Sequence, residues 1–336
     1  MRSGIAKRHF IVGKTILALM FSQIFVWSAT GTPIGASTNS LAGAITQASL
    51  TKLINASISV HRLPSSLKPS LSFLAGKLDG GNTDLAQTSC GYIEFGAWRE
   101  PIAHCYLGDT SSKITVALVG DSRASMYLNT FAALGKLEHF KVLFIAKDAC
   151  PSPLGTYATN NNGKLGPAAW TTCSKFHSFE ISNLVRIKPK LIVVSSNTEI
   201  VLTNPVHVAS PQEIQADMTA FLSKLPASSR VIVLGGFPQP APASNPTVCL
   251  SRNPSNVTSC AFNPLASTLA DNAAFASAAT AVGDAFVNQT PWFCTSTCPA
   301  IIGRYVPYTI DAYHSNNTYL NFLKGVLWSS IGRYVK

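Results

Sequence analysis

Charged side chains are scarce in this chain. They make up 12% of its 336 residues, with 15 acidic side chains against 26 Lys and Arg. The resulting formal net charge of +11 favours anionic surfaces such as phospholipid, envelope phosphate polymers or nucleic acid. The basic residues are scattered, however, and no basic stripe interleaved with aromatic side chains is present. Nucleic acid is therefore not an expected partner.

The chain also lacks internal repeats and low-complexity tracts. With 46% hydrophobic residues, 22 Gly and 20 Pro, its composition is typical of a compact, loop-rich globular protein rather than a disordered one. The length suits one large α/β domain or two small ones and allows a substantial buried core.

The long uncharged run is confined to the N-terminus. Four basic residues lie within residues 1–14, and residues 15–36 carry no charge, a pattern typical of an export signal. Small residues near positions 28–30 and 35–37 favour a cleaved signal peptide, whereas the length of the run favours a retained membrane anchor. We expect one of these two over residues 1–37. In both cases the rest of the chain is exported and is periplasmic or extracytoplasmic, secreted or anchored.

The remaining chain divides into a linker and an α/β region. Residues 38–89 are rich in Ser, Ala, Leu and Pro and predict a linker with at most one short helix. Beyond it, apolar runs predict strands over 114–119, 141–146, 190–195, 230–234 and 284–287. Helical patterns alternate with them over 122–136, 174–188, 211–224, 264–282 and 316–334. This alternation predicts a parallel sheet with helices on both faces, and ligands bind such sheets beyond the carboxyl ends of the strands.

Patterns for a metal or a cofactor are missing. No cysteine pair has zinc-ribbon spacing with a second CxxC, and the histidines do not cluster with the cysteines in the sequence. The glycine-rich turn at 235–238 follows a predicted strand, and a plain turn is a simpler explanation for it than a cleft-lining role. It lacks the surrounding glycines of a dinucleotide or phosphate loop. We therefore expect neither a metal nor a cofactor.

Eight cysteines suit an oxidising compartment. Many pairings are open to eight cysteines, and we expect neighbours in sequence to pair because each pair brackets a Gly-, Pro- or Asn-rich loop. The expected disulfides are Cys90 with Cys105, Cys150 with Cys173, Cys249 with Cys260, and Cys294 with Cys298.

Three polar residues suggest a reaction centre. The first apolar run stops at Gly120 and leads through an aspartate to Ser122 at the start of a predicted helix, while Asp311 and His314 lie three residues apart before the last helical pattern. A serine, a histidine and an aspartate are the side chains that a Ser-His-Asp hydrolase or acyl-transfer site requires. Alone, Gly-Asp-Ser is better explained by helix capping than by catalysis. A lone histidine is likewise more often a hydrogen-bonded structural residue than a catalyst. Their conjunction favours catalysis, because a loop after the last strand can return to the carboxyl edge of the sheet.

The order of these motifs resembles the SGNH or GDSL-like hydrolases, whose first block is strand-Gly-Asp-Ser and whose last is Asp-x-x-His. It is more closely similar to the periplasmic SGNH domain fused to acyltransferase-3 membrane proteins, which O-acetylate cell-envelope glycans. Supporting pieces are a Pro-rich approach at 63–69, the first cysteine pair, Ala149-Cys150-Pro151, and the segments 170–173 and 294–299. The likeness spans residues 63–336, without the multi-spanning acyltransferase half.

The resemblance implies a three-layer α/β sandwich with a central parallel sheet in flavodoxin-like order, and a catalytic domain over residues 90–336. By position, Ser122 is the nucleophile, His314 the general base and Asp311 the orienting acid. The fused domains commonly have histidine after the serine, and here Arg123 stands there, which leaves the acceptor preference open.

The resemblance also implies an oxyanion hole. The third block of the superfamily, Gly-x-Asn-Asp, corresponds to residues 195–198, which keep Asn197 but not the glycine or the aspartate. The expected donors are the Asn197 side chain, the backbone N–H of Ser122, and Gly155 as the nearest glycine after the second strand. Simple turn roles for Asn197 and Gly155 remain the alternatives.

These features predict an exported enzyme that moves a short acyl group, expected to be acetyl, through an acyl-Ser122 intermediate. The acceptor or donor is a hydroxyl of an envelope glycan or glycolipid, and both transfer and hydrolysis remain open. Transfer requires a separate integral-membrane acyltransferase as the acyl donor. The alternative is a non-catalytic envelope-glycan-binding module that keeps the SGNH fold and holds anionic polymer through its positive charge.

Overall fold

The computed structural model describes residues 41, 43–76, 105–161, 164–203, 205–241 and 244–336. All of them belong to one compact unit, residues 39–336. The expected signal peptide or anchor over 1–37 and the first cysteine, Cys90, lie outside these residues. Within the described ranges, none of the helices combines the length and the apolar character needed to cross a membrane.

The described residues form a six-stranded sheet in the order β1-β3-β2-β6-β9-β10. Its strands are β1 (Tyr106–Gly108), β2 (Thr115–Gly120), β3 (Lys141–Ala146), β6 (Leu191–Ser195), β9 (Arg230–Leu234) and β10 (Ala285–Val287). All neighbours pair in parallel except β1, which is antiparallel to β3 at one edge. Across the sheet, the five strands other than β1 lie in the flavodoxin-like order that we expected. The fold class is therefore confirmed.

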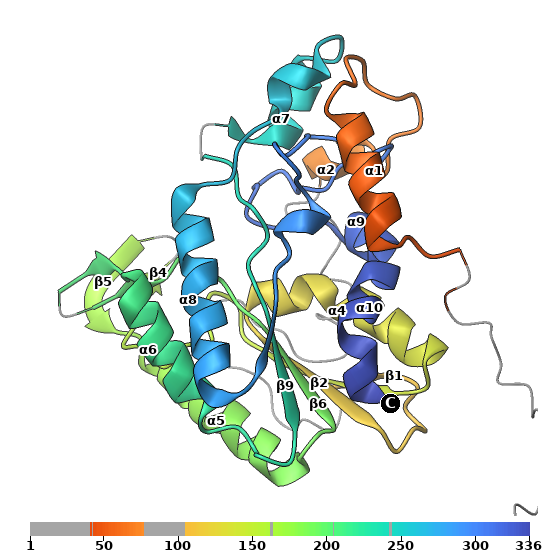
Figure 1. The fold of residues 1–336 in the computed structure, drawn as a ribbon. Coiled ribbons are helices and arrows are strands. Elements are labelled where there is room, and N and C mark those ends of the chain that lie inside the picture. Colours follow the sequence, from red (N-terminus) through yellow and green to blue (C-terminus); the bar gives the residue numbers. More distant parts are fainter. Residues whose placement is uncertain (1–40, 42, 77–104, 162–163, 204, 242–243) are drawn as a thin grey trace, which may run out of the picture. The chain divides into compact units, whose positions relative to one another are not determined.

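Helices cover both faces of this sheet (Figure 1). They are α1 (Gln47–Ser57), α2 (Leu71–Gly76), α4 (Ser122–Leu137), α5 (Thr171–Ile187), α6 (Pro211–Leu222), α7 (Pro246–Arg252), α8 (Ala266–Val282), α9 (Asn317–Phe322) and α10 (Lys324–Val335). The helix expected over 316–334 is thus two helices that meet at Leu323. Two small hairpins, β4 (Ala158–Asn161) with β5 (Lys164–Ala169) and β7 (Val201–Leu202) with β8 (His207–Val208), were not expected from the sequence.

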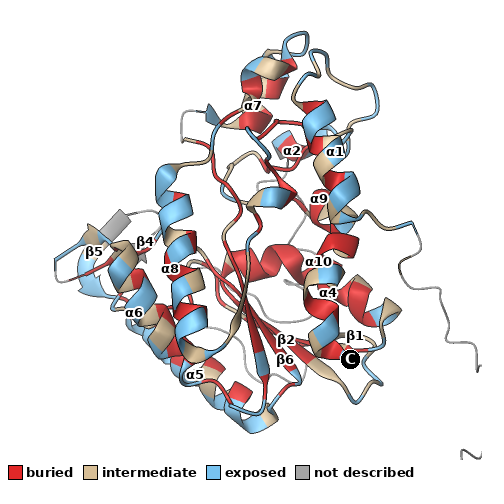
Figure 2. Ribbon diagram, viewed as in Figure 1, coloured by how far each residue is buried: buried red, intermediate tan, exposed pale blue. Residues whose placement is uncertain are grey.

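The strands are buried on both faces because they are continuous apolar runs (Figure 2). In β2, Val116 and Leu118 face one core, which also receives α1, α4, α9 and α10. Ala117 and Val119 face the other core, together with α5, α6 and α8. This alternation produces the three layers and leaves the carboxyl ends of the strands at one edge of the sheet.

The expected linker over 38–89 is wrong for its described part. The helix α1 buries Leu50 and Ile54 in the core beside α4 and α10. The helix α2 buries Leu74 against Leu250 and Val306 in a separate small cluster. The Ser- and Ala-rich composition concealed these contacts, because the apolar residues are few but lie on one helical face.

Candidate active site

Gly120 brings the chain out of β2 at the carboxyl edge of the sheet. Its φ of +138° lies in a region that side chains rarely adopt, and a Cβ there would be 1.9 Å from the Ser195 backbone oxygen. Asp121 is the N-cap of α4, and its Oδ1 accepts the backbone N–H of Arg123 at 2.9 Å. Asp121, and not Ser122, therefore caps α4. The Ser122 hydroxyl is not used in capping.

Asp311 and His314 come from the loop between β10 and α9. The Asp311 Oδ1 accepts the backbone N–H groups of Tyr313 at 2.9 Å and His314 at 3.1 Å, and also the Thr309 hydroxyl. Ala312 has a φ of +60°, so the loop reverses direction between the acid and the base. These contacts fix the carboxylate and the imidazole relative to each other.

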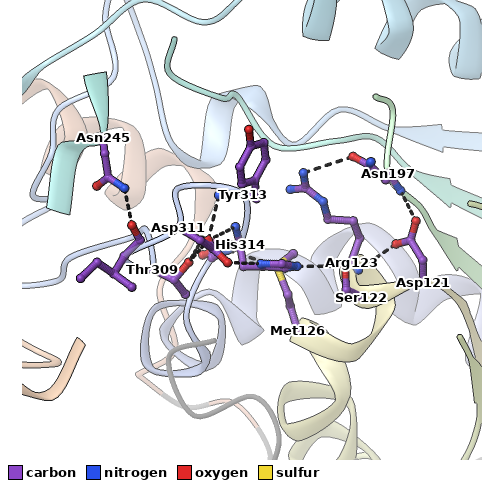
Figure 3. A network of polar contacts seen from close by, with 12 residues as sticks. Asp121, Ser122, Arg123, Met126, Asn197, Asn245, Thr309, Asp311, Tyr313 and His314 are labelled. Carbon is purple, nitrogen blue, oxygen red and sulfur yellow. Dashed lines mark hydrogen bonds and ion pairs between the residues drawn. The ribbon is translucent and has the colours of Figure 1, made fainter. Parts of the chain in front are cut away.

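The loop brings the base to the serine across a separation of 192 residues (Figure 3). His314 Nε2 lies 2.9 Å from Ser122 Oγ, and His314 Nδ1 lies 2.7 Å from Asp311 Oδ2. An ionised carboxylate only accepts hydrogen bonds, so Nδ1 carries the ring proton and Nε2 accepts the Ser122 hydroxyl proton. The residues that the sequence singled out thus form one continuous relay.

The pKa values of two carboxyl groups at the site, half-buried Asp311 and fully buried Asp121, are shifted in opposite directions. Burial raises the pKa of Asp311, but hydrogen bonds from His314 and Thr309 outweigh it, so the pKa lies below its usual value. Burial also raises the pKa of Asp121, and here it outweighs the backbone N–H groups of Asn197 and Arg123. Asp311 is therefore the group held ready to orient and stabilise an imidazolium.

Asn197 lies next to this relay, at the end of β6. Its backbone N–H donates to Asp121 Oδ2 at 2.8 Å, its side-chain Nδ2 donates to the Glu199 backbone oxygen at 2.8 Å, and its Oδ1 accepts from Arg123 Nη2 at 3.3 Å. The Glu199 contact is a turn interaction, the alternative considered above. An amide nitrogen has two hydrogens, so one of them remains for a substrate oxygen.

Gly155 is placed differently from Asn197. A Cβ at Gly155 would lie 2.6 Å from the Leu202 side chain and 2.7 Å from Asp217 Oδ2, so this glycine permits close packing against β7 and α6. Its assignment to the oxyanion hole stays a prediction.

Three of the expected disulfides are confirmed: Cys150–Cys173, Cys249–Cys260 and Cys294–Cys298. Cys105 is buried, and its expected partner Cys90 lies outside the described residues. The first of these disulfides joins the loop after β3 to the start of α5.

The expectation that no histidine lies with the cysteines is wrong for His177. Its Nε2 lies 3.6 Å from Cys150 Sγ and 2.8 Å from the Pro151 backbone oxygen. The spacing of four residues between Cys173 and His177 on one helix was the overlooked signal. Both sulfur atoms are in the disulfide, so they are not thiolate ligands for a metal.

For the turn at 235–238 the sequence favoured a plain glycine-rich turn over a cleft-lining role, and it gave no signal for Gln239. The Arg123 guanidinium lies over the Phe237 ring, with Cζ 4.6 Å from the ring centroid. Gln239 has its amide beside the same guanidinium, and with the carbonyl turned toward it Nη1 donates at 3.2 Å. The glycine-rich turn after β9 therefore lines the site, although it carries no recognisable motif.

Several solved structures are similar to this chain. The periplasmic domain of a lipopolysaccharide acetyltransferase from Salmonella ser. Paratyphi A aligns with a TM-score of 0.51 and 14% identity, covering 86% of this chain and 98% of that domain. A putative acylhydrolase from Bacteroides fragilis gives 0.41 and 14% identity over 70% and 94% of the two chains. Est24, a carbohydrate acetylesterase from Sinorhizobium meliloti, gives 0.40 and 12% over 66% and 99%.

Among curated protein sequences, none matches the chain. A family model described as the SGNH domain fused to AT3 domains matches residues 89–328, which contain all three relay residues and all the strands of the large sheet. The chain therefore belongs to the family of SGNH domains that are fused to AT3 domains.

Proposed function

We infer that this protein is an exported, serine-dependent enzyme that transfers or hydrolyses short acyl groups on hydroxyls of cell-envelope glycans. The observation that carries this proposal is the relay from Ser122 Oγ through His314 to Asp311, with distances of 2.9 and 2.7 Å. Membership of the SGNH family supports an acyl-group hydrolase or transferase. A polysaccharide-binding module would have no need of such a relay.

The geometry of the relay supports a first half-reaction in which Ser122 is the nucleophile. Ser122 Oγ attacks the carbonyl carbon of an acyl ester, while His314 Nε2 takes the hydroxyl proton and becomes an imidazolium held by Asp311. The ester carbonyl oxygen becomes an oxyanion, for which the Ser122 backbone N–H and the remaining Asn197 hydrogen are the candidate donors. The intermediate then expels the alcohol, which receives the proton from Nε2, and leaves an acyl-Ser122.

The second half reverses these roles. His314 Nε2 takes a proton from an acceptor hydroxyl, the acceptor oxygen attacks the acyl-Ser122 carbonyl, and Ser122 leaves with the proton returned by the imidazolium. Water as acceptor gives hydrolysis, and a glycan hydroxyl gives transfer. One site serves both outcomes, and the choice depends on which acceptor reaches the acyl-serine first.

We propose that the acyl group is acetyl and that the acceptor is an envelope glycan. A solved domain that shares this fold, from Salmonella, belongs to a lipopolysaccharide acetyltransferase. The family description names AT3 domains as fusion partners, which supports a separate membrane acyltransferase as the acyl donor. Export is supported by the basic N-terminus with its uncharged run and by the disulfides.

The test is turnover of a colour-producing acetyl ester by the purified protein and by Ser122→Ala. We expect turnover by the wild type and its loss in the variant, because only the nucleophile is removed. Ser125→Ala is the matched control: Ser125 is a buried serine on the same helix whose hydroxyl bonds the Asp121 backbone oxygen at 3.4 Å, and it should keep wild-type turnover. Equal turnover by Ser122→Ala and the wild type would overturn the proposal.

A further inference from the structure

A buried positive charge lies beside the relay. The Arg123 side chain is 5% exposed, yet within the described residues no carboxylate lies close enough to form an ion pair with it. The acidic groups that act on it, Asp121, Asp311 and Glu199, do so at longer range. A buried charge without a close partner is costly, so a function is the expected reason for its retention.

The contacts of this guanidinium are directed at oxygen atoms of two amides. Nη2 donates to Asn197 Oδ1 at 3.3 Å. With the Gln239 amide oriented so that its oxygen faces the guanidinium, the orientation that satisfies both groups, Nη1 donates to that oxygen at 3.2 Å and Nη2 donates to it as well. The Phe237 ring lies against the guanidinium, with the ring centroid 4.6 Å from Cζ, and restricts its position. Figure 3 shows the side chain turning back from the start of α4 toward Asn197.

These contacts decide which way the Asn197 amide points. A guanidinium has only donors, so it selects the orientation in which Oδ1 faces Arg123 and Nδ2 faces away from it. The backbone of Glu199 supports the same orientation, since its oxygen accepts from Nδ2. The hydrogen that remains on Nδ2 is thereby kept in a fixed direction, and its N–H dipole is strengthened by the positive charge on the other end of the amide.

We propose that Arg123 is a positioning residue that acts through Asn197 to stabilise the oxyanion of the acyl-transfer intermediate. The inference rests on the proposed function. Arg123 fixes the amide and polarises it, so that an uncharged ester already meets an oriented donor when its carbonyl oxygen becomes negative. This role differs from binding an anionic part of the substrate, because it operates on neutral substrates too.

The experiment is a double-mutant cycle on turnover of a neutral acetyl ester by the full-length protein. Arg123→Met removes the charge and nearly keeps the volume, and Asn197→Ala removes the donor. We expect Arg123→Met to lower kcat by about tenfold with little change in KM, since the oxyanion exists mainly in the transition state. In the Asn197→Ala background the same substitution should cost almost nothing. Arg123→Lys should recover only part of kcat, because an ammonium lacks the two-pronged geometry.

Several results would overturn the inference. Additive losses in the cycle would mean that Arg123 does not act through Asn197. A rise in KM confined to acidic esters would mean that Arg123 binds substrate charge, and a lower Tm with unchanged kcat per folded molecule would mean that its role is structural. Arg304→Met, which removes an exposed arginine lying against Tyr305, controls for the loss of one net charge and should leave kcat unchanged.

A second readout separates this inference from the proposed function. A neutral nitrophenyl phosphonate reacts with an activated serine, displaces nitrophenolate and leaves a phosphonyl-serine, and its transition state carries negative charge on the phosphoryl oxygen. Slower Ser122 labelling in Arg123→Met than in the wild type would support the positioning role even if acetyl esters are not turned over. Equal labelling rates would contradict it.

Discussion

The Asp121 carboxylate joins the ends of two neighbouring strands, because its Oδ2 accepts the Asn197 backbone N–H at 2.8 Å while its Oδ1 caps α4. The carboxylate is fully buried, so these hydrogen bonds replace its contact with water. Two consequences follow for the site. The Ser122 hydroxyl is left for His314, and Asn197 is held at a constant position relative to the nucleophile.

Loss of the base or its orienting acid should remove most of the turnover. We expect His314→Ala to abolish ester turnover and Asp311→Asn to lower it by about a thousandfold or more, because an unoriented imidazole is a poor base. The measurement is kcat on a neutral acetyl ester, together with Tm. A matched control is His139→Ala: His139 lies 3.3 Å from Asp109 in a similar His-Asp pair on the surface, and its loss should leave kcat unchanged. Near-normal turnover in both relay variants would show that the relay does not operate.

The Asn197 side chain should affect catalysis more than stability. If it donates to the oxyanion, Asn197→Ala should lower kcat by about a hundredfold with little change in KM. The alternative turn role predicts a lower Tm and an unchanged kcat per folded molecule. Asn183→Ala provides the comparison, since Asn183 bonds only within its own helix: Nδ2 donates to the Phe179 backbone oxygen and Oδ1 accepts from Arg186 Nη2, both at 2.8 Å. Unaltered kcat in Asn197→Ala would remove this residue from the oxyanion hole.

Glu180 should make the protein less stable at higher pH. Burial raises the pKa of this α5 carboxyl well above its usual value, and the Asp121 charge adds to the effect. The folded state therefore keeps a proton that the unfolded state loses above its ordinary pKa, so stability falls as the pH rises from there toward the folded pKa. Glu180→Gln removes this proton linkage. We expect a higher Tm than wild type at pH 8 and a smaller gain at pH 4.

Glu213, whose pKa is shifted in the opposite direction, is the control for Glu180. The backbone N–H and the hydroxyl of Ser210, with His207, lower the pKa of Glu213 to about 2. Its contribution to stability is present above the unfolded pKa and is lost as the pH falls through the folded value. Glu213→Gln should therefore lower Tm at pH 8 and have less effect at acid pH. If Glu180→Gln and Glu213→Gln changed Tm at pH 8 in the same direction, the opposite pKa shifts assigned to these two carboxyls would be refuted.

The disulfides should differ in their contribution to stability. Cys150 and Cys173 are separated by 23 residues and Cys294 and Cys298 by 4. Loop-closure entropy predicts losses of about 3 and about 2 kcal/mol when each pair is replaced by serine. Urea unfolding without reductant measures both. A larger loss for the short loop would show that Cys294–Cys298 contributes through native contacts instead, in the segment that leads to Asp311 and His314.

The sheet could be predicted well from the sequence, because the strands are continuous apolar runs with clear ends. The bounds of β3 and β9 match the expected 141–146 and 230–234. The hairpins β4-β5 and β7-β8 are short and carry no clear alternation, so local pattern did not reveal them. The sequence allowed one short helix in the linker but did not predict the position or packing of α1, because its few buried apolar residues, Leu50 and Ile54, lie a full turn apart in a polar segment.

The sequence predicted which residues make up the relay, but it did not predict the contacts around them. Residue types and motif order identified Ser122, Asp311 and His314, because their chemistry is restrictive. The position of Arg123 over Phe237 depends on two segments 114 residues apart in sequence, and no local pattern reports such packing. Gly155 was chosen by proximity in sequence alone, and the structure packs it against Leu202 and Asp217.

The most direct test of the account is whether Ser122 carries the acyl group during turnover. The protein is mixed with a reactive acetyl ester, quenched with acid within the first turnovers, and digested for peptide mass analysis. We expect an acetyl group on the peptide that contains Ser122 in the wild type and none in Ser122→Ala. Turnover by the wild type with Ser122 unmodified at every quench time, and no covalent adduct trapped there, would contradict the proposed mechanism.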